Sequence, residues 1–375
     1  MKYLFNEQSD CWIDEAKALQ YYRCFDGIAI QAGTLLGSGF EPYHLNGVTL
    51  PEKVNGIPVT ELNGVFKQDE IGYIESTKLK RIDIKVIVEK NSYGNSRCCF
   101  PILCGGLQNT LQSIRFTFLA DKANINRIED PTVRSTIEYI GFDGKIIDDT
   151  DWDYGSFQSG LFEGCANLKG IHGRFEGYCL TGNTFEGCTS LISLPDIRVK
   201  YMGDREFLNC SSLLKVHLHS GLVKIGDECF KNCKSLTDLF IPDTVEHIGS
   251  SAFEGCTRLD TIHFSKAITN ISNRLFANCV KLQKVFLSDA TKTIGNEAFW
   301  GCASLKKPWL PEGLTSIGEK AFFGCVSMKE IFIPESLSFI GSNAFSECND
   351  LVIHGNVGTI AEQYANENKI NFVAN

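Results

Sequence analysis

Apolar residues recur through the second half of the chain at fixed positions of a 23-residue unit. A phenylalanine is followed three residues later by a cysteine, and three residues after that by a leucine or methionine. Nine units in one register identify a repeat. The columns are Phe162, Phe185, Phe207, Phe230, Phe253, Phe276, Phe299, Phe322 and Phe345, then Cys165, Cys188, Cys210, Cys233, Cys256, Cys279, Cys302, Cys325 and Cys348, then Leu168, Leu191, Leu213, Leu236, Leu259, Leu282, Leu305, Met328 and Leu351.

Most units continue with alternating apolar and polar residues, as in LTDLFIP from Leu236 to Pro242. Such alternation predicts a short strand. A turn and an Ile-Gly pair follow, as at Ile248 and Gly249, and a helical or 3₁₀ turn that ends in the phenylalanine would close the coil. One unit cannot bury its own apolar side, so we expect stacked coils whose strands pair in parallel.

The repeated phenylalanine and cysteine are best explained by packing. Each phenylalanine would fill the centre of its coil, which contributes about 1.5–3 kcal/mol by burial. Each cysteine would act as a small buried side chain whose thiol donates weakly to neighbouring backbone. A metal or redox ladder is the alternative, but there is one cysteine per coil and no histidine in phase. Metal sites need several converging ligands, so we expect no metal and no cofactor.

These units resemble the BspA-type leucine-rich repeat family, with the pattern I-G-x-x-A-F-x-x-C-x-x-L-x-x-I-x-I-P. The match is close at Ile294–Pro311 and Ile317–Pro334. Thr49–Phe66 is similar to the family's opening unit, and Thr359–Asn375 to its closing cap, a short helix with Ile360, Ala361, Tyr364 and Ala365 on one face. Known members are mostly non-enzymatic, and many are surface adhesins of bacteria and protozoan parasites that bind host or matrix proteins. The resemblance implies a binding role of that kind.

The predicted fold is a leucine-rich repeat solenoid, a right-handed stack of short parallel strands with turns or short helices on the other face. We expect an N-terminal cap over residues 1–45, divergent repeats with insertions over 46–160, regular repeats over 161–354 and a helical C-terminal cap over 355–375. Within the irregular half, residues 79–84 (LKRIDI) and 111–116 (LQSIRF) fit the strand pattern at a spacing of 32 residues. Pro308 stands at a core strand position, where it should interrupt the strand.

One polar-side position of the predicted strands carries aromatic rings in successive units. These rings would project from the open face of the sheet, where apolar patches mark interaction surfaces. We interpret them, with two neighbouring lysines, as a surface for a protein partner or a glycan. Cross-strand pairing that only stabilises the sheet is the alternative. The predicted binding residues are His217, Phe240, His263, Phe286, Trp309, Phe332, Lys284 and Lys307.

Four other features carry weaker hypotheses. Trp300 and Phe323 follow the core phenylalanines of adjacent coils, where they form either a self-association patch or a local contact. Residues 148–155 (DDTDWDYG) lack the glycine and glutamate of a calcium-binding EF-hand loop and are interpreted as a solvated acidic loop. Residues 98–104 (CCFPILC) have no second cysteine pair and are a weak zinc signal. Residues 313–320 (GLTSIGEK) imitate a phosphate-binding loop, but Glu319 occupies the lysine position.

Composition narrows the function. The net charge of −9 argues against a nucleic-acid partner, and the lack of a long apolar run argues against membrane insertion. The sequence shows no catalytic motif. We therefore expect a non-enzymatic protein-interaction module. The alternatives are a secreted or cell-surface adhesin, or an enzyme or regulator with its activity in residues 1–160. Localisation stays open, because the N-terminus lacks a signal-peptide core but a signal could have been removed.

Overall fold

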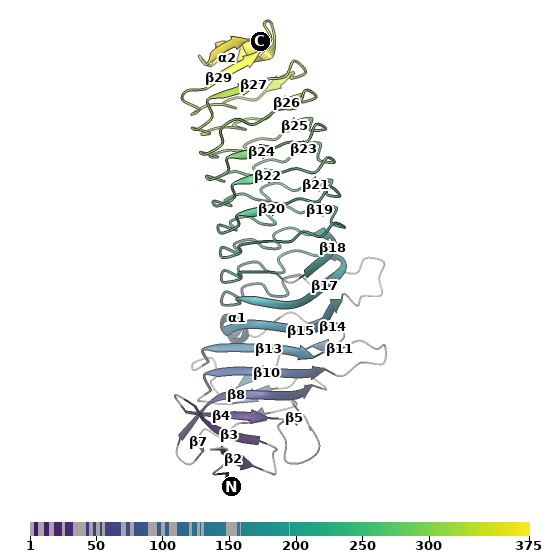
Figure 1. The fold of residues 1–375 in the computed structure, drawn as a ribbon, viewed down its shortest axis with the longest axis vertical. Helices are drawn as coiled ribbons and strands as arrows, with labels where there is room; N and C mark the ends of the chain where they lie inside the picture. The colour runs from purple at the N-terminus through teal and green to yellow at the C-terminus, as the bar shows by residue number, and fades with distance from the viewer. Residues whose placement is uncertain are drawn as a thin grey trace. The chain divides into compact units, whose positions relative to one another are not determined.

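Figure 1 draws the computed structural model as a ribbon. The chain divides into two compact units, which are described separately. Unit 1 comprises residues 1–151 and 164–176, and unit 2 comprises residues 152–163 and 177–375. The structure describes residues 4–6, 11–14, 19–24, 27–32, 43–44, 48–49, 53–54, 57–68, 73–75, 79–88, 96–98, 102–104, 111–119, 122–125, 128, 131–147, 156–157, 159–194 and 196–375.

Unit 1 begins with an antiparallel meander and continues as a parallel sheet. The meander comprises β1 (Leu4–Asn6), β2 (Cys11–Asp14), β3 (Leu19–Cys24) and β4 (Gly27–Ala32). β4 pairs in parallel with the long strand β8 (Ile57–Gln68). The shorter strands of this unit are β5 (Tyr43–His44), β6 (Val48–Thr49), β7 (Lys53–Val54), β9 (Tyr73–Glu75), β11 (Ser96–Cys98), β12 (Ile102–Cys104) and β14 (Lys122–Ile125).

The parallel sheet of unit 1 confirms the two strands predicted in the irregular half. They are β10 (Arg81–Val88) and β13 (Ser113–Leu119), and Ile82 faces Ile114 across their 32-residue spacing. β8 and β15 (Ile137–Ile147) flank this pair, and helix α1 (Pro131–Thr136) leads into β15. The first residues of β17 (Gly170–Leu180) continue the ladder from β15. Insertions therefore lengthen the connections while the strands stay adjacent.

Unit 2 is a parallel-strand solenoid, as the sequence predicts, but most of its coils contribute two strands rather than one (Figure 1). One series contains the aromatic positions: β20 (Asp238–Phe240), β22 (Thr261–His263), β24 (Lys284–Phe286), β27 (Glu330–Phe332), β29 (Val352–Gly355) and β30 (Asn371–Ala374). The other contains β18 (Asp196–Met202), β19 (Lys224–Ile225), β21 (His247–Ile248), β23 (Asn270–Ile271), β25 (Thr293–Ile294), β26 (Ser316–Ile317) and β28 (Phe339–Ile340). β16 (Ser156–Phe157) pairs with the end of β17.

The second series lies at the isoleucines of the Ile-Gly pairs, where the sequence analysis predicted no strand. Ile294 is buried and pairs in register with Ile317 of the next coil, so these residues form a ladder. Gly295 follows, and a Cβ atom there would lie 2.6 Å from Asn273 Oδ1 and 2.8 Å from the Ile271 carbonyl oxygen. Only glycine allows the coils to approach this closely.

Pro308 interrupts the aromatic strand series, as expected. Residues 305–310 form no strand, whereas β24 lies before them and β27 after them. Proline has no backbone N–H to donate to the ladder, which accounts for the gap. Trp309, next in the chain, is therefore presented from irregular backbone between two short sheets.

The phenylalanine column forms the core of unit 2, which confirms the packing interpretation. Successive rings from Phe162 to Phe345 stack with centroids 5.0–5.7 Å apart and interplanar angles of 6–22°. The cysteine thiols lie beside this stack. From Cys188 to Cys348, each repeat cysteine donates to the carbonyl oxygen of the phenylalanine in the preceding coil, with Sγ–O distances of 3.1–3.3 Å.

A short helix covers the last coil. In α2 (Ile360–Glu367), Ala361, Tyr364 and Ala365 are buried, whereas Ile360, expected on the same face, is half-buried. The Tyr364 ring meets Phe345 edge-on, with centroids 5.7 Å apart, and its hydroxyl accepts a hydrogen bond of 3.3 Å from the Phe345 N–H. This tyrosine therefore closes the phenylalanine stack, which would otherwise end in water.

Candidate interaction surface

The predicted aromatic positions lie on one face of unit 2. The side chains of Phe240, Phe286, Trp309 and Phe332 are 71%, 47%, 52% and 44% exposed. Each is preceded by a buried residue, as expected where successive side chains of a strand point to opposite faces. Register pairing sets Phe240 beside His263, and His263 beside Phe286. We call the set His217, Phe240, His263, Phe286, Trp309, Phe332 and His354 the aromatic stripe.

The sequence analysis missed one member of the stripe. His354 pairs in register with Phe332, and the two rings stack with centroids 4.3 Å apart and an interplanar angle of 7°. The last unit is one residue shorter than the others between Leu351 and the buried Ile353. Counting a fixed number of residues from the repeat leucine therefore misses His354. Aligning that unit on its buried isoleucine would have found it.

The stripe contains two stacked pairs. His263 stacks on Phe286 just as His354 stacks on Phe332, with centroids 4.3 Å apart and planes 7° from parallel. Phe332 also receives Lys307 Nζ, which lies 4.5 Å from the ring centroid. Trp309 contacts no other ring among the residues that the structure describes. Its indole is therefore exposed and has no stacked ring beside it, unlike Phe286 and Phe332.

The two predicted lysines differ in their surroundings. Lys307 Nζ lies 2.7 Å from Glu330 Oε1, and His354 Nε2 lies 3.7 Å from Glu330 Oε2. Hydrogen bonding from Lys307 is the main cause that lowers the pKa of the Glu330 carboxyl, so this glutamate stays charged. Lys284 begins β24 and is exposed. Lys307 is therefore already paired within the chain.

A cavity of about 230 Å³ opens beside Trp309. Trp309 and Phe332 line it together with Glu312 and Glu335, and Asn356 and Asn375 are further polar residues of its lining. Glu312 and Glu335 occupy equivalent positions 23 residues apart. The sequence analysis did not single out these glutamates, because each lies in a turn that looks polar and exposed in every unit.

Trp300 and Phe323 lie side by side at the edge formed by the phenylalanine turns, as predicted. Their ring centroids are 6.5 Å apart, and both side chains are half-buried. Arg274 Cζ lies 5.9 Å from the Trp300 ring centroid. Nothing in this geometry decides between self-association and a local contact, so the self-association patch stays a prediction.

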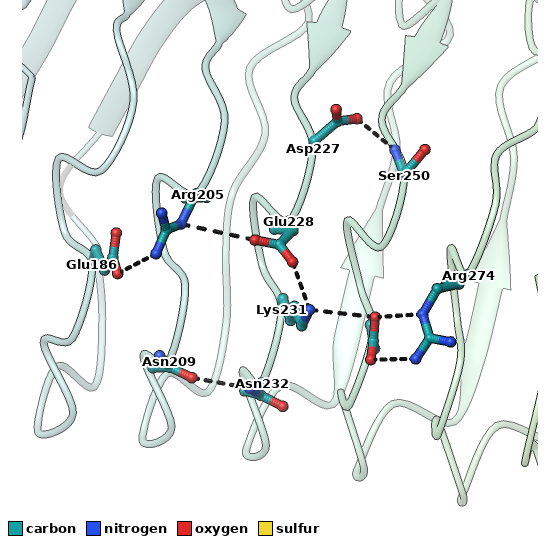
Figure 2. Close-up of polar contacts among 10 residues, drawn as sticks. Glu186, Arg205, Asn209, Asp227, Glu228, Lys231, Asn232, Ser250 and Arg274 are labelled. Atoms are coloured by element: carbon teal, nitrogen blue, oxygen red, sulfur yellow. Dashed lines mark hydrogen bonds and ion pairs between the residues drawn. The ribbon is translucent and has the colours of Figure 1, made fainter.

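An ion-pair ladder runs along successive coils as far as Arg274 (Figure 2). Arg274 is the residue that lies beside the Trp300 ring. Arg205 bridges Glu186 at 2.8 Å and Glu228 at 3.8 Å, and Lys231 bridges Glu228 at 2.6 Å. Glu254 then meets Lys231 at 3.6 Å and Arg274 at 2.9 Å, and Arg274 also pairs with Glu297. The four glutamates and three basic residues of the ladder alternate and leave a net charge of only −1, so the ladder mainly joins successive coils.

Burial keeps the repeat thiols neutral. Burial raises the pKa of the Cys210 and Cys256 thiols to about 12, although backbone hydrogen bonding acts to lower it. A protonated thiol is a poor nucleophile and a poor metal ligand. Within the described residues, no group of three or more His, Cys, Asp or Glu side chains is placed to hold a metal ion.

Glu206 is a buried carboxylate in a position where most later repeats have alanine. It accepts backbone N–H groups from Gly182 at 2.6 Å, Thr184 at 3.1 Å and Gly203 at 3.2 Å. Burial nevertheless raises its pKa to about 7, and these hydrogen bonds only partly offset that effect. The side chain accepts the backbone N–H groups of the turn in the 22-residue unit, so its role is structural.

Some sequence hypotheses lie outside the described residues. These are the acidic loop 148–155 and the side chains of the cysteine cluster 98–104.

Residues 313–320 form an ordinary turn of the solenoid that includes β26, and the Glu319 N–H donates to Asn296 Oδ1 of the preceding coil at 2.9 Å. Across the parts of the chain that are described, helices are too short and too polar to cross a membrane.

One of three similar solved structures, that with a TM-score above 0.5, supports the fold. A leucine-rich repeat protein from Bacteroides ovatus is 20% identical, with a TM-score of 0.58, over 97% of this chain and 99% of that one. A leucine-rich cell surface protein from Faecalibacterium prausnitzii is 18% identical over 95% and 97%, with a TM-score of 0.40. A leucine-rich repeat protein from Eubacterium ventriosum is 18% identical over 88% and 92%, with a TM-score of 0.43. No curated protein matches the sequence.

The repeat pattern identifies the family directly. The model of the BspA-type leucine-rich repeat region matches in six copies over residues 147–239 and 223–352, which is more than half of the 375 residues. The matched region contains the phenylalanine stack, the thiol hydrogen bonds and the aromatic stripe up to Phe332. The chain therefore belongs to the BspA-type leucine-rich repeat family.

Proposed function

We propose that this chain is a non-enzymatic recognition module that binds a protein partner through the aromatic stripe. The observation that carries the proposal is the alignment of Phe240, Phe286, Trp309 and Phe332 on one face with 44–71% of each side chain exposed. Exposed aromatic rings are enriched among the residues that dominate binding energy. The stacked core holds them in place, so a partner would gain contacts at little ordering cost.

The other candidate functions rest on less. Leucine-rich repeats are a non-enzymatic kind of fold, and both the family and the fold neighbours are of this kind. An enzyme within residues 1–160 therefore has no support from the described residues. A surface adhesin would bind through the same stripe and would differ from the proposed module only in the location of its partner. A glycan partner is an outcome that the binding experiment distinguishes.

The test is affinity capture with the intact chain, repeated with the double variant Trp309→Ala and Phe286→Ala. We expect at least a tenfold loss of binding to the captured partner, because two exposed rings are removed from one surface. Phe339→Ala is the matched control, since Phe339 is 54% exposed but lies on β28 of the other strand series. Unchanged binding by the double variant to every identified partner would overturn the proposal. Capture of glycans alone would exclude a protein partner.

A further inference from the structure

We propose that the cavity beside Trp309 binds a basic side chain, arginine in preference to lysine, of the protein partner. This inference rests on the proposed function and names the chemistry of the partner at one point of the stripe. It follows from the size of the cavity, its charge, the open indole, and a contact of the same kind elsewhere in the chain.

The size of the cavity suits one side chain. Its volume of about 230 Å³ is below the roughly 300–1,000 Å³ of typical small-molecule sites. Trp309 and Phe332 lie 23 residues apart, as do Glu312 and Glu335, so two adjacent coils each contribute a ring and a carboxylate. A long side chain entering here would have rings along its stem and carboxylates at its charged end.

The charged side chains that line the cavity are negative. Lys292 Nζ lies beside Gly313, next to Glu312, but forms no ion pair with that glutamate in the described structure. No lysine, arginine or histidine lines it. Across the described residues, neither Glu312 nor Glu335 has an ion-pair partner. Nearby carboxylates are satisfied differently, since Glu330 meets Lys307 and His354, and Asp350 meets Lys329. The two cavity glutamates are thus available to a cation from outside the chain.

The open indole favours a cation with a flat or extended apolar part. Trp309 is 52% exposed and has no ring neighbour among the described residues. Tryptophan is the best aromatic partner for a cation, and a guanidinium group can both stack on the ring and bind carboxylates with its fork of donors. A neutral sugar could stack on the same ring but would leave both carboxylates without a counter-charge.

The chain already makes this type of contact once on the same face. Lys307 Nζ lies 4.5 Å from the Phe332 ring centroid and 2.7 Å from Glu330 Oε1. One ring and one carboxylate there hold a cation at the surface. The cavity offers the Trp309 indole, a stronger cation partner than a phenyl ring, and two glutamates. Lys307, a predicted binding residue, is neutralised by Glu330, whereas Glu312 and Glu335 at the cavity are negative and have no ion-pair partner in the described structure.

The test uses N-acetyl-L-arginine methylamide as the probe and the ¹H–¹⁵N signal of the Trp309 indole as the readout. We expect a saturable shift of that signal in the full-length chain, with the Trp300 indole as an internal reference that does not move. The citrulline analogue has nearly the same shape without the charge and should bind at least tenfold more weakly. The lysine analogue should bind, but more weakly than the arginine probe.

Two sets of variants complete the test. Glu312→Gln with Glu335→Gln should weaken arginine binding at least tenfold, whereas Glu246→Gln, an exposed glutamate without an ion-pair partner in the described structure, should leave it unchanged. All three positions are exposed, so the variants should fold, and the phenylalanine-core signals check this. Equal binding of arginine and citrulline, no saturable shift, or a shift with methyl glucoside alone would overturn the proposal. If arginine fails while partner capture still requires Trp309 and Phe286, the cavity assignment is wrong and the stripe stands.

Discussion

The thiol of Cys256 donates a hydrogen bond to the carbonyl oxygen of Phe230 in the preceding coil, with 3.2 Å between Sγ and O. The same contact recurs from coil to coil, so each cysteine fastens its own bend to the backbone of the coil before it. The thiol is fully buried, which leaves it no water as an alternative partner. One small side chain both packs against the core and donates a hydrogen bond. This explains why a cysteine follows the phenylalanine by three residues in every unit.

Replacing Cys256 with alanine should lower the free energy of unfolding by about 1–2 kcal/mol, because the hydrogen bond and part of the packed volume are lost. Chemical denaturation of the two proteins measures the difference. The Phe230 carbonyl also accepts the Cys233 N–H at 3.1 Å, so the variant should still fold. A variant as stable as the parent would show that the thiol only fills space.

The Cys256 thiol should resist alkylation in the folded protein. Burial raises its pKa to about 12, so very little thiolate exists at pH 8, and the atom is also inaccessible. Iodoacetamide treatment followed by peptide mass spectrometry should find Cys256 unmodified in the native state and modified in denaturant. Native-state labelling at the rate of an exposed cysteine would contradict the buried position.

Glu206 should make the protein less stable as the pH rises. Its folded-state pKa of about 7 lies above the ordinary value of 4.5, so the folded state holds the proton more tightly. The resulting stabilisation is fully present below pH 4.5 and is lost between that pH and about pH 7, on the order of 3 kcal/mol. Denaturation at pH 5 and pH 8 measures it. Glu206→Gln cannot ionise and should remove this part of the pH dependence, and an unchanged dependence would refute the assignment.

Backbone strain at Glu347 offers a stabilising substitution. Glu347 has a φ of 62°, at the position where Gly324 has a φ of 72° one coil earlier. A side chain in this left-handed region costs about 1 kcal/mol, so Glu347→Gly should raise the free energy of unfolding by roughly that amount. Gly324→Ala is the matched reverse change, since its Cβ would meet nothing closer than 3.7 Å and only the strain remains. Opposite signs are expected in thermal unfolding, and equal signs would contradict the strain.

Arg274 should stabilise the ion-pair ladder. It bridges Glu254, which is almost fully buried, and Glu297. Burial acts to raise the pKa of the Glu254 carboxyl, but hydrogen bonds with Arg274 and Ser251 and the charges of Arg274 and Lys231 outweigh it and lower the pKa. Arg274→Ala leaves that carboxylate with Ser251 and with Lys231 as its one cation in the described structure, and should cost about 1–3 kcal/mol.

Lys320→Ala is the control for the Arg274 variant. Lys320 has a φ of 52°, close to the 55° of Arg274, but among the described residues it pairs only with the adjacent Glu319 at the surface. The backbone contribution of the two alanine substitutions should therefore be equal. A loss below about 0.5 kcal/mol is expected for Lys320→Ala. Equal losses for the two variants would mean that the ladder contributes nothing to stability.

The sequence by itself determined the repeating parts of this protein. The 23-residue spacing places each repeat phenylalanine, such as Phe253, in the same environment. The pattern of one unit therefore predicts the phenylalanine stack, the thiol position and the exposed stripe for the other units. The interruption at Pro308 was also predictable, because a missing N–H is a property of the residue itself. The second strand series was not, since it depends on how closely glycines such as Gly295 let adjacent coils approach.

Only the tertiary structure decided which side chains meet across coils. Lys307 and Trp309 stand two residues apart and look equally available in the sequence, yet Lys307 pairs with Glu330 while Trp309 contacts no ring in the described structure. Glu312 and Glu335 look like ordinary turn residues until they line one cavity, and Glu206 looks like a surface acid until three N–H groups surround it. Periodicity determines which face a residue occupies. Its partners depend on side-chain torsion angles and on distances to the neighbouring coils, which the repeat pattern does not encode.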